Sequence, residues 1–181
     1  MLEKQDCRRA IRDRLSTLSE NDRRVESAVI VRHLRDAIDH AQTIAGFMPY
    51  ADEPNILPLM EEILQSGKTL CIPQVIQNRL VMKEVHTLNI SRNPLTGIPD
   101  PIDGNTIDEA TIDCVIVPGR AFMKTGERMG RGNGGYDYWI HAQRTRNPKT
   151  VFLGVCFECQ LMTSLPMEAH DEHVDMVITS R

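Results

Sequence analysis

The segment Val115-Ile-Val-Pro-Gly-Arg-Ala-Phe-Met-Lys-Thr-Gly-Glu-Arg-Met-Gly-Arg-Gly-Asn-Gly-Gly-Tyr-Asp137 carries the clearest structural pattern in the chain. It begins with an apolar run typical of a buried strand, continues as a loop rich in glycine and arginine, and ends where a helix is predicted. The loop contains Gly130, Gly132, Gly134 and Gly135. Glycine permits positive φ angles and close approach of a ligand to the backbone. The amides of such a turn, with a helix N-terminus behind it, can bind an anion.

The charged residues of the same segment favour a phosphate as that anion. Arg128 and Arg131 lie beside the glycines, and a guanidinium presents a fork of donors that suits phosphate oxygens. Asp137 follows directly and could bind the magnesium ion that accompanies a nucleotide. The segment has neither the Gly-Lys-Ser/Thr ending of a Walker A loop nor the GxGxxG dinucleotide pattern. A solvent-exposed glycine-rich loop without a ligand is the alternative interpretation.

The segment resembles the hallmark of the 5-formyltetrahydrofolate cyclo-ligase family (methenyltetrahydrofolate synthetases). In that family a strand and Val-Pro-Gly precede Ala-Phe-Asp and then Gly-x-Arg-Leu-Gly-x-Gly-x-Gly-Tyr-Tyr-Asp. The matching residues are Val117-Pro118-Gly119, Ala121-Phe122, Gly126-Glu-Arg128-Met-Gly130-Arg-Gly132-Asn-Gly134 and Tyr136-Asp137. Shorter family-like pieces occur in the same order along the chain: Lys4-x-x-x-Arg8, Pro49-x-x-x-Glu53, Gly67-Lys68 before Ile72-Pro73, Gly97-Ile98 and His170-Asp171.

The resemblance implies an ATP- and magnesium-dependent ligase that converts 5-formyltetrahydrofolate to 5,10-methenyltetrahydrofolate, with release of ADP and phosphate. It implies catalytic roles for Arg131 and Asp137, and magnesium ligands at Asp137 and Asp171. The implied ATP-binding residues are Lys4, Arg8, Arg128, Met129, Gly130, Arg131, Gly132, Asn133, Gly134, Gly135 and Tyr136. The implied folate-binding residues are Met48, Glu53, Arg131, Gly134 and Gly135.

Three residues depart from the family pattern. Met123 stands where the family has aspartate after Ala-Phe, Gly135 replaces the first tyrosine of Tyr-Tyr-Asp, and Tyr138 replaces a frequent basic residue. These departures keep a second hypothesis open, in which the chain is a catalytically weak or inactive relative that binds nucleotide or folate as a sensor or interaction domain. A phosphosugar or acyl-CoA enzyme is a third option because α/β folds host many chemistries, but the sequence offers no candidate nucleophile or base for it.

Length and composition are those of a globular protein with one domain over residues 1–181. The chain has 181 residues, of which 41% are hydrophobic and 25% charged. Its net charge of -4 argues against broad nucleic-acid or membrane binding, so small molecules are the expected partners. Five cysteines and no recognisable secretion signal predict reduced thiols and a cytoplasmic location. We expect a monomer.

Hydrophobic periodicity and turn residues predict a three-layer α/β fold, in which a mostly parallel sheet is covered by helices on both faces. The predicted helices cover the first forty residues, with an N-cap box at Ser19–Asp22, a segment capped by Asn55 and ending at Gly67, and Gly135–Arg146. The predicted strands are Thr43–Met48, Thr69–Ile72, Leu80–Val85, Asp113–Val117, Thr150–Phe157 and Val174–Thr179. Asn89–Thr111 reads as an extended connection.

Ligands of such sheets bind beyond the carboxyl ends of the strands, which is where the glycine loop falls. Glu53 also follows a strand end, although a loop carboxylate in water would give the same pattern. Lys4, Arg8 and Arg12 share one helical face, and a solvated basic surface is the alternative to phosphate binding.

Two further patterns have a metal or redox interpretation. Cys156-Phe-Glu-Cys159 has CxxC spacing, but no second cysteine pair accompanies it and its setting is apolar. A buried, inert thiol is therefore the favoured reading. His170-Asp-Glu-His173 could bind zinc, whereas the family resemblance uses only Asp171 and leaves both histidines unassigned.

Overall fold

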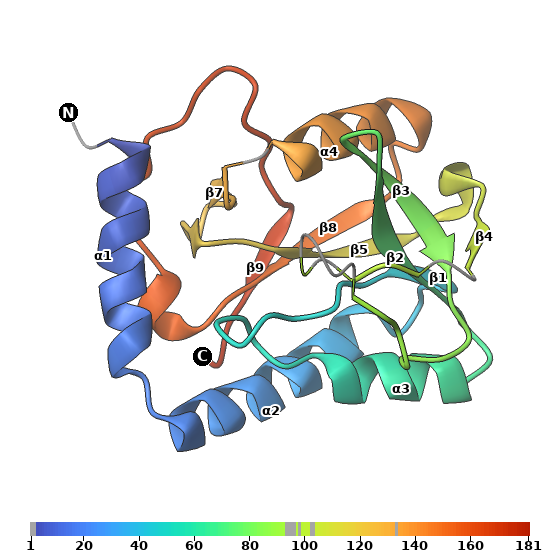
Figure 1. Ribbon diagram of the computed structural model, residues 1–181, viewed down its shortest axis with the longest axis horizontal. Helices are drawn as coiled ribbons and strands as arrows, with labels where there is room; N and C mark the ends of the chain where they lie inside the picture. Colours follow the sequence, from blue (N-terminus) through green and yellow to red (C-terminus); the bar gives the residue numbers. More distant parts are fainter. Residues whose placement is uncertain (1–2, 93–96, 98, 102–103, 133) are drawn as a thin grey trace.

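The computed structural model describes residues 3–92, 97, 99–101, 104–132 and 134–181. In this part of the chain seven strands form one sheet in the order β4-β3-β2-β1-β5-β8-β9 (Figure 1). The strands are β1 (Thr43–Ala45), β2 (Thr69–Ile76), β3 (Arg79–Glu84), β4 (Asn105–Thr106), β5 (Cys114–Pro118), β8 (Val151–Val155) and β9 (Met176–Ile178). The pairs among β2, β1, β5, β8 and β9 are parallel, and β3 and β4 join antiparallel. The predicted mostly parallel α/β fold is confirmed.

Helices cover both faces of the sheet. The helices are α1 (Lys4–Thr17), α2 (Glu20–Ala37), α3 (Leu57–Gln65) and α4 (Gly135–Arg146), with 3-10 turns at Glu109–Thr111 and Glu158–Gln160. Figure 1 shows α2 and α3 on one face and α4 on the other. Among the described residues, no helix has both the length and the apolar character needed to cross a membrane.

Alternation along the central strand β5 explains the three layers. Cys114 and Ile116 pack into the cluster formed with α2 and α3, whereas Val115 and Val117 pack into the cluster formed with α4. All four side chains are buried. A strand between two helical layers must be apolar on both sides, which is why its sequence is a continuous apolar run.

Helix α1 belongs to a separate, smaller cluster beside the sheet. Its buried residues Cys7, Ile11 and Leu15 pack against a two-stranded ribbon formed by β6 (Ala121–Phe122) and β7 (Arg128–Met129). The ribbon directly precedes the loop glycines in the sequence. Helix α1 therefore packs against the residues from which the glycine loop starts. The N-terminal helix is thereby placed near a loop more than a hundred positions later in the sequence.

Most predicted elements are present with small changes in their ends. The first helical region is two helices, and Ser19 caps α2 by accepting a hydrogen bond from the Asp22 amide at 3.1 Å. The bounds predicted for α4 are those observed. Gly67 has φ +76°, as predicted for the residue that ends α3. The predicted cap Asn55 is wrong by one position, because Ile56 is the N-cap, although Asn55 still accepts a hydrogen bond from Leu57.

The largest difference lies in β2, which was predicted to end at Ile72, before Pro73, but continues to Ile76. The carbonyl of Cys71 accepts a hydrogen bond from Gly46, so Cys71 and Pro73 direct their backbone groups toward β1. Pairing with β1 ends at Cys71, and no donor is needed where the proline lies. The strand then turns through Gln77 and Asn78, both at positive φ, into antiparallel β3.

Other strand ends also moved. β1 stops at Ala45 rather than Met48, β8 spans Val151–Val155, and β9 spans Met176–Ile178. The segment predicted as an extended connection contains the short strand β4 and the 3-10 turn at Glu109–Thr111. The strand β4 pairs with β3, and the 3-10 turn contacts α4. Both elements are too short for hydrophobic periodicity to reveal them.

Candidate functional site

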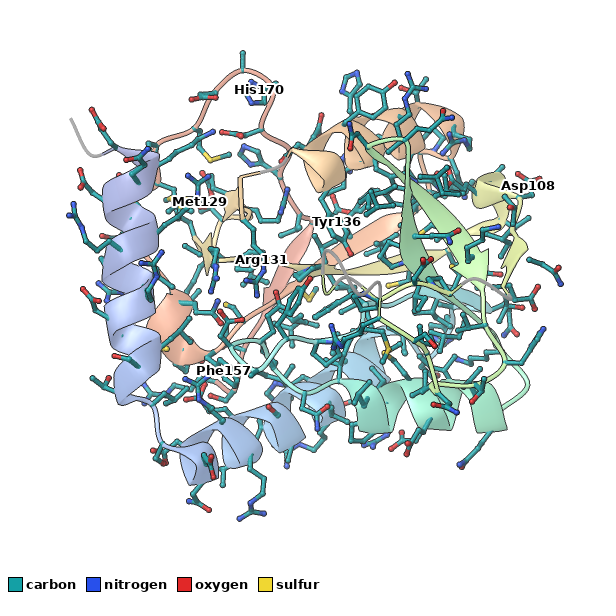
Figure 2. The ribbon with its side chains drawn as sticks, in the orientation of Figure 1. Asp108, Met129, Arg131, Tyr136, Phe157 and His170 are labelled. Atoms are coloured by element: carbon teal, nitrogen blue, oxygen red, sulfur yellow. The ribbon has the colours of Figure 1, made fainter. Side chains whose placement is uncertain are left out.

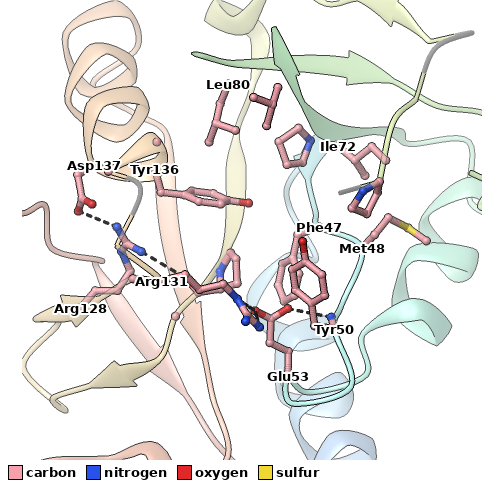
Figure 3. A pocket seen from close by; sticks show the side chains of 18 residues that line it. Phe47, Met48, Tyr50, Glu53, Ile72, Leu80, Arg128, Arg131, Tyr136 and Asp137 are labelled. Carbon is pink, nitrogen blue, oxygen red and sulfur yellow. Dashed lines mark hydrogen bonds and ion pairs between the residues drawn. The ribbon is translucent and has the colours of Figure 1, made fainter. Parts of the chain in front are cut away.

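The two central parallel strands β1 and β5 end at the same edge of the sheet, and a pocket of about 140 Å³ lies beyond them (Figure 3). The segment after β1 forms one wall and the glycine loop forms the other. The hairpin β2–β3 supplies a third, apolar side. The lining residues are Phe47, Met48, Tyr50, Glu53, Ile72, Pro73, Val75, Leu80, Pro99, Pro118, Gly119, Arg128, Gly130, Arg131, Gly134, Gly135, Tyr136 and Asp137.

The glycines of the loop act in different ways. Gly132 and Gly134 have φ of +106° and +65°, so positive φ is confirmed at these two positions. At Gly130 a side chain would come within 3.0 Å of the Arg128 guanidinium, so this glycine allows close packing instead. Gly134 is the N-cap of α4 and makes no side-chain cap, which leaves the first amides of the helix available to an anion.

Arg128 lies beneath the loop, and its side chain is only 2% exposed. Its Nη2 donates to Asp137 Oδ1 at 2.6 Å, and its Nη1 donates to the Pro118 carbonyl at 3.4 Å. The guanidinium carbon is 5.8 Å from the centre of the Tyr136 ring. Nε is buried and lacks a hydrogen-bond partner among the described residues. Arg128 therefore faces the pocket with its charge already balanced by Asp137.

Arg131 crosses the pocket to the opposite wall. Its Nη2 donates to Glu53 Oε1 at 2.8 Å and to Asp52 Oδ1 at 2.6 Å, and Nε also donates to Glu53 at 3.2 Å. Its guanidinium lies over the Tyr50 ring, 4.4 Å from the centre. Burial lowers the pKa of Arg131, but the two carboxylates outweigh burial and raise it above the ordinary value. The sequence predicted both Arg131 and Glu53 at this site without predicting that they form an ion pair.

Glu53 is the buried member of this group, with a side chain 6% exposed. Its second oxygen, Oε2, accepts a hydrogen bond from the Tyr50 amide at 3.0 Å. Met48 lines the same pocket and packs against the cluster beneath it. The pocket thus combines apolar lining residues with two ion-pair groups, Arg131–Glu53 and Arg128–Asp137, and a few polar groups in an apolar cavity are typical of small-molecule sites.

The two predicted metal ligands lie in different surroundings. Asp137 lines the pocket and accepts hydrogen bonds through Oδ1 from Arg128 and from the Glu172 amide. No hydrogen bond from the described residues reaches its Oδ2, so a carboxylate oxygen is available for a magnesium ion. Asp171 is bound instead through both oxygens to Lys4 Nζ, at 2.9 and 2.7 Å. Asp137 fits a metal ion as the structure stands, whereas Asp171 would first have to release Lys4.

The predicted basic face of α1 divides into three situations. Lys4 pairs with Asp171 and Glu168. Arg8 reaches the glycine loop, where its Nε donates to the Gly130 carbonyl at 3.3 Å. Arg12 is exposed to solvent. The face is therefore a solvated surface at Arg12 and part of the loop's surroundings at Arg8.

The histidine and cysteine patterns lie outside the pocket. Glu168, His170 and Asp171 bring three possible ligand atoms within 4.8 Å of one another, but His173 is not part of this group. Figure 2 shows His170 on an outer loop, away from Arg131. Cys156 is fully buried, and burial raises its thiol pKa, which supports the interpretation as an inert thiol. All five cysteines are free.

The three departures from the family pattern have distinct surroundings. Gly135 faces Leu80, since a Cβ on Gly135 would lie 3.5 Å from Leu80 Cγ. Tyr138 is 63% exposed and lies beneath the Arg79 guanidinium, 5.7 Å from it. Met123 packs against the α1 cluster. The predicted ATP-binding residue Asn133 lies outside the described residues, as does Ile98.

Sequence reasoning missed Asp52, Arg120 and Leu80. Asp52 binds both Arg131 and Arg120, although it directly precedes Glu53 in the sequence and could have been considered with it. Arg120 follows the Val-Pro-Gly motif without being part of it. Leu80 comes from a strand that gave no functional signal. Only the fold brings the three segments to one pocket.

Comparison with known proteins gives the relationship directly. The model of the 5-formyltetrahydrofolate cyclo-ligase family matches residues 1–180. The mouse 5-formyltetrahydrofolate cyclo-ligase is 27% identical, over 97% of this chain and 92% of its own length. The cyclo-ligase of Escherichia coli K12 is 28% identical, over 77% of this chain and 78% of its own length.

Two solved structures share the fold. The NMR structure of 5,10-methenyltetrahydrofolate synthetase from Aquifex aeolicus has a TM-score of 0.83 at 29% identity, covering 99% of this chain and 91% of that one. A synthetase from Mycoplasma pneumoniae has a TM-score of 0.80 at 21% identity, covering 99% of this chain and all of that one, and it shows the likeness of fold. With the family match over nearly the whole chain, these findings establish that the chain belongs to the 5-formyltetrahydrofolate cyclo-ligase family.

Proposed function

We propose that this protein converts 5-formyltetrahydrofolate to 5,10-methenyltetrahydrofolate and that ATP is the second substrate, with ADP and phosphate as the other products. The observation that carries the proposal is the meeting of Arg131 and Glu53 in one pocket. A cation from an anion-binding loop and a buried carboxylate from the opposite wall suit two ligands of different chemistry. One ligand carries phosphates, and the other presents hydrogen-bond donors.

The chemistry requires an oxygen to leave the formyl group. In the proposed reaction the formyl oxygen attacks the terminal phosphorus of ATP, and the bond from that phosphorus to the ADP oxygen breaks. The neighbouring folate nitrogen then attacks the formyl carbon and loses its proton. The carbon–oxygen bond breaks, and the oxygen leaves within the phosphate. This sequence needs aligned substrates and balanced charge more than a side-chain nucleophile.

The loop side of the pocket suits the nucleotide. Its first α4 amides have no side-chain cap, and Arg131 and Arg8 bring positive charge to the loop. In the proposed complex these groups bind phosphate oxygens and stabilise the charge that develops during transfer. Arg128 holds Asp137 in place beneath them. Lys4 is proposed to contact phosphate only after it leaves Asp171.

The opposite side suits the folate ring. Glu53 presents a buried carboxylate that can accept hydrogen bonds from adjacent donors of a pterin. Met48 and Leu80 supply apolar surface in the same cavity. Gly134 and Gly135, which also line it, leave room for a ligand close to the backbone.

A magnesium ion fits the site through Asp137. When bound, it would neutralise charge on the phosphate oxygens. Asp137 Oδ1 is bound to Arg128, and Oδ2 is the oxygen that remains for the ion. Asp171 is proposed as a second carboxylate near the ion, directly or through water, once Lys4 has moved.

The decisive experiment is a turnover assay with 5-formyltetrahydrofolate, ATP and magnesium, read as growth of the absorbance of the methenyl product. We expect product only when all three are present, and one ADP formed for each product molecule. Protein that binds both ligands by calorimetry without any turnover would contradict the enzyme and support the sensor or interaction domain. Arg35→Ala, which alters an ion pair outside the pocket, is the matched control.

A further inference from the structure

Asp52 connects the two cations that come from the loop side of the pocket. Its Oδ1 accepts a hydrogen bond from Arg131 Nη2 at 2.6 Å, and its Oδ2 accepts one from Arg120 Nη1. Burial alone would raise the pKa of Asp52, but hydrogen bonds and charge from Arg131 and Arg120 outweigh it and lower the pKa. The carboxylate is therefore ionised at neutral pH and bridges two guanidinium groups.

Arg120 is the fixed end of this bridge. Its amide donates to the Met129 carbonyl at 2.7 Å, and its carbonyl accepts a hydrogen bond from the buried Gln160 side chain at 3.0 Å. Asp52 thus connects Arg131 to the side chain of a residue whose backbone is hydrogen-bonded on both sides. Arg131 has its remaining contacts with Glu53 and the Tyr50 ring.

We propose that Asp52 is a positioning residue that tethers Arg131 between the two half-sites, and that Arg131 exchanges Glu53 for a nucleotide phosphate when the substrates bind. The inference rests on the proposed function, because it takes a phosphate ligand on one side of Arg131 and a hydrogen-bond donor ligand on the other. Asp52 keeps Arg131 at the boundary while its other partner changes.

The exchange makes the two substrates promote one another's binding. When Arg131 turns to a phosphate, Glu53 loses its cation while its side chain is only 6% exposed. The Tyr50 amide still donates to Oε2, but Oε1 loses its hydrogen bonds from Arg131. A buried carboxylate oxygen without a donor is unfavourable, and the donors of a folate ring restore the lost hydrogen bonds. The first ligand breaks the Arg131–Glu53 ion pair. The second ligand then binds a side chain of that pair without having to break it. The coupling is reciprocal, since each ligand raises the affinity of the other by the same factor.

The coupling is measured by calorimetry on the full chain, as the Kd of 5-formyltetrahydrofolate with and without a saturating non-hydrolysable ATP analogue and magnesium. For the wild type we expect about tenfold tighter folate binding with the analogue, and for Asp52→Asn a factor below about threefold. Glu62→Gln alters the Arg35–Glu62 pair, which is also an arginine bound through two hydrogen bonds, and should keep the wild-type factor. Equal folate affinity with and without the analogue in the wild type would overturn the proposal.

A double-mutant cycle separates positioning from general loss of structure. The KM for ATP is measured for Asp52→Asn, for Arg131→Ala and for the double variant, together with the urea midpoint of each. If Asp52 acts through Arg131, each single change raises the KM and the double variant is no worse than Arg131→Ala. Additive effects would show that Asp52 acts independently and would overturn the proposal.

The outcomes also distinguish this inference from the proposed function. A wild type that turns over substrate but binds its two ligands independently keeps the function and loses the exchange. A wild type that binds neither ligand loses both. An Asp52→Asn variant whose coupling equals that of the wild type removes Asp52 from the role.

Discussion

Arg128 and Arg131 are three residues apart in one loop, and their ion pairs differ in character. The Arg128 side chain is 2% exposed and its partner Asp137 is 14% exposed, whereas Arg131 and Asp52 are 33% and 34% exposed. Breaking a buried pair leaves a charge without water or partner, while an exposed pair contributes little to stability. The difference indicates that Arg128 is part of the fold and that Arg131 is free to change partners. Sequence spacing alone gives the two arginines the same role.

The largest effect that this comparison predicts is the loss of stability in Arg128→Ala. Removing the guanidinium leaves Asp137 nearly buried and, among the described residues, with one hydrogen bond, from the Glu172 amide. We expect the free energy of unfolding, measured in urea, to fall by about 3–5 kcal/mol. Arg35→Ala removes an exposed pair and should barely change the urea midpoint. If Arg128→Ala were as stable as the wild type, the structural role of the buried pair would be wrong.

Arg131→Ala should show the opposite pattern, with function lost and the fold retained. Arg131 is itself 33% exposed, but its removal leaves the Glu53 carboxylate, which is 6% exposed, without its cation. The free energy of unfolding should therefore fall by about 1–3 kcal/mol, less than for Arg128→Ala. Loss of a charge-assisted phosphate contact, worth about 1.5–3 kcal/mol, should weaken ATP binding about tenfold or more. Calorimetry with ATP and a urea titration on the same preparation check both halves. Unchanged ATP affinity would show that Arg131 does not bind phosphate and only forms ion pairs with the protein.

Glu53→Gln tests the other partner of Arg131. The amide keeps the shape of the side chain but loses the charge that accepts hydrogen bonds from folate and from Arg131. We expect the KM for folate to rise about tenfold or more, by the same charge-assisted estimate, while ATP affinity stays the same or improves. Steady-state kinetics with each substrate varied in turn measures the two constants. A similar rise in both would contradict a folate-specific role.

The Lys4–Asp171 pair lies between the two arginine pairs in burial, at 21% and 9% side-chain exposure. Burial lowers the pKa of Lys4, but hydrogen bonds to Asp171 and Glu168 raise it above the ordinary value. Burial raises the pKa of Asp171, but the hydrogen bond from Lys4 outweighs burial and brings the pKa below its ordinary value. The lowered pKa of Asp171 stabilises the fold above about pH 4, and this contribution is lost as the pH falls through the folded-state pKa. The raised pKa of Lys4 stabilises the fold below about pH 10.4, and this contribution is lost as the pH rises through the folded-state pKa of Lys4.

Lys4→Met should therefore reduce stability only between these limits. We expect a loss of up to about 1 kcal/mol at pH 7 that shrinks as the pH falls through the lowered pKa of Asp171, because the protonated carboxyl no longer pairs with Lys4. Urea unfolding at several pH values measures the difference. Arg12→Met, which alters an exposed residue of the same helix, is the control and should leave the curve unchanged. A loss of the same size at every pH would point to packing instead of charge.

The fold was largely predictable because its signals are local or periodic. Apolar runs gave the central strands, and Ser19 and Gly67 marked helix ends that the structure confirms. The continuation of β2 beyond Pro73 was not predictable, because it depends on where β1 ends. A proline in a strand is tolerated when no neighbour needs its amide, and that is a property of the assembled sheet.

The structure brings several of the predicted site residues together, but through contacts that were not predicted. The sequence placed Arg131, Glu53 and Asp137 at the carboxyl ends of strands, and the structure brings all three to one pocket. It could not show that Arg131 pairs with Glu53, since 78 positions separate them. Residue type and spacing did not distinguish the burial of Arg128 from that of Arg131, because burial is decided by the packing of α4 and the ribbon β6–β7 around them.

The smallest predicted effect concerns Gly135, which begins the helix that follows the two arginines. Its Cα faces Leu80, and a Cβ would lie 3.5 Å from Leu80 Cγ, an ordinary contact distance. Gly135→Ala should therefore fold normally and gain about 0.4–1 kcal/mol, because alanine restricts the unfolded chain. A tyrosine at this position would need the space that Leu80 occupies. If the missing tyrosine weakens folate binding, Gly135→Tyr can therefore restore it only where Leu80 makes room.

We expect Gly135→Tyr alone to gain little, and Gly135→Tyr with Leu80→Ala to lower the KM for folate about two- to tenfold, as an aromatic contact worth about 0.5–1.5 kcal/mol would do. Leu80→Ala alone is the control, since it empties the space without filling it. ATP affinity should stay constant across the series, because the loop arginines are unchanged. If the single tyrosine variant performs as well as the double, Leu80 moves aside freely and does not limit this wall of the pocket. If neither variant gains, the glycine at position 135 does not weaken folate binding.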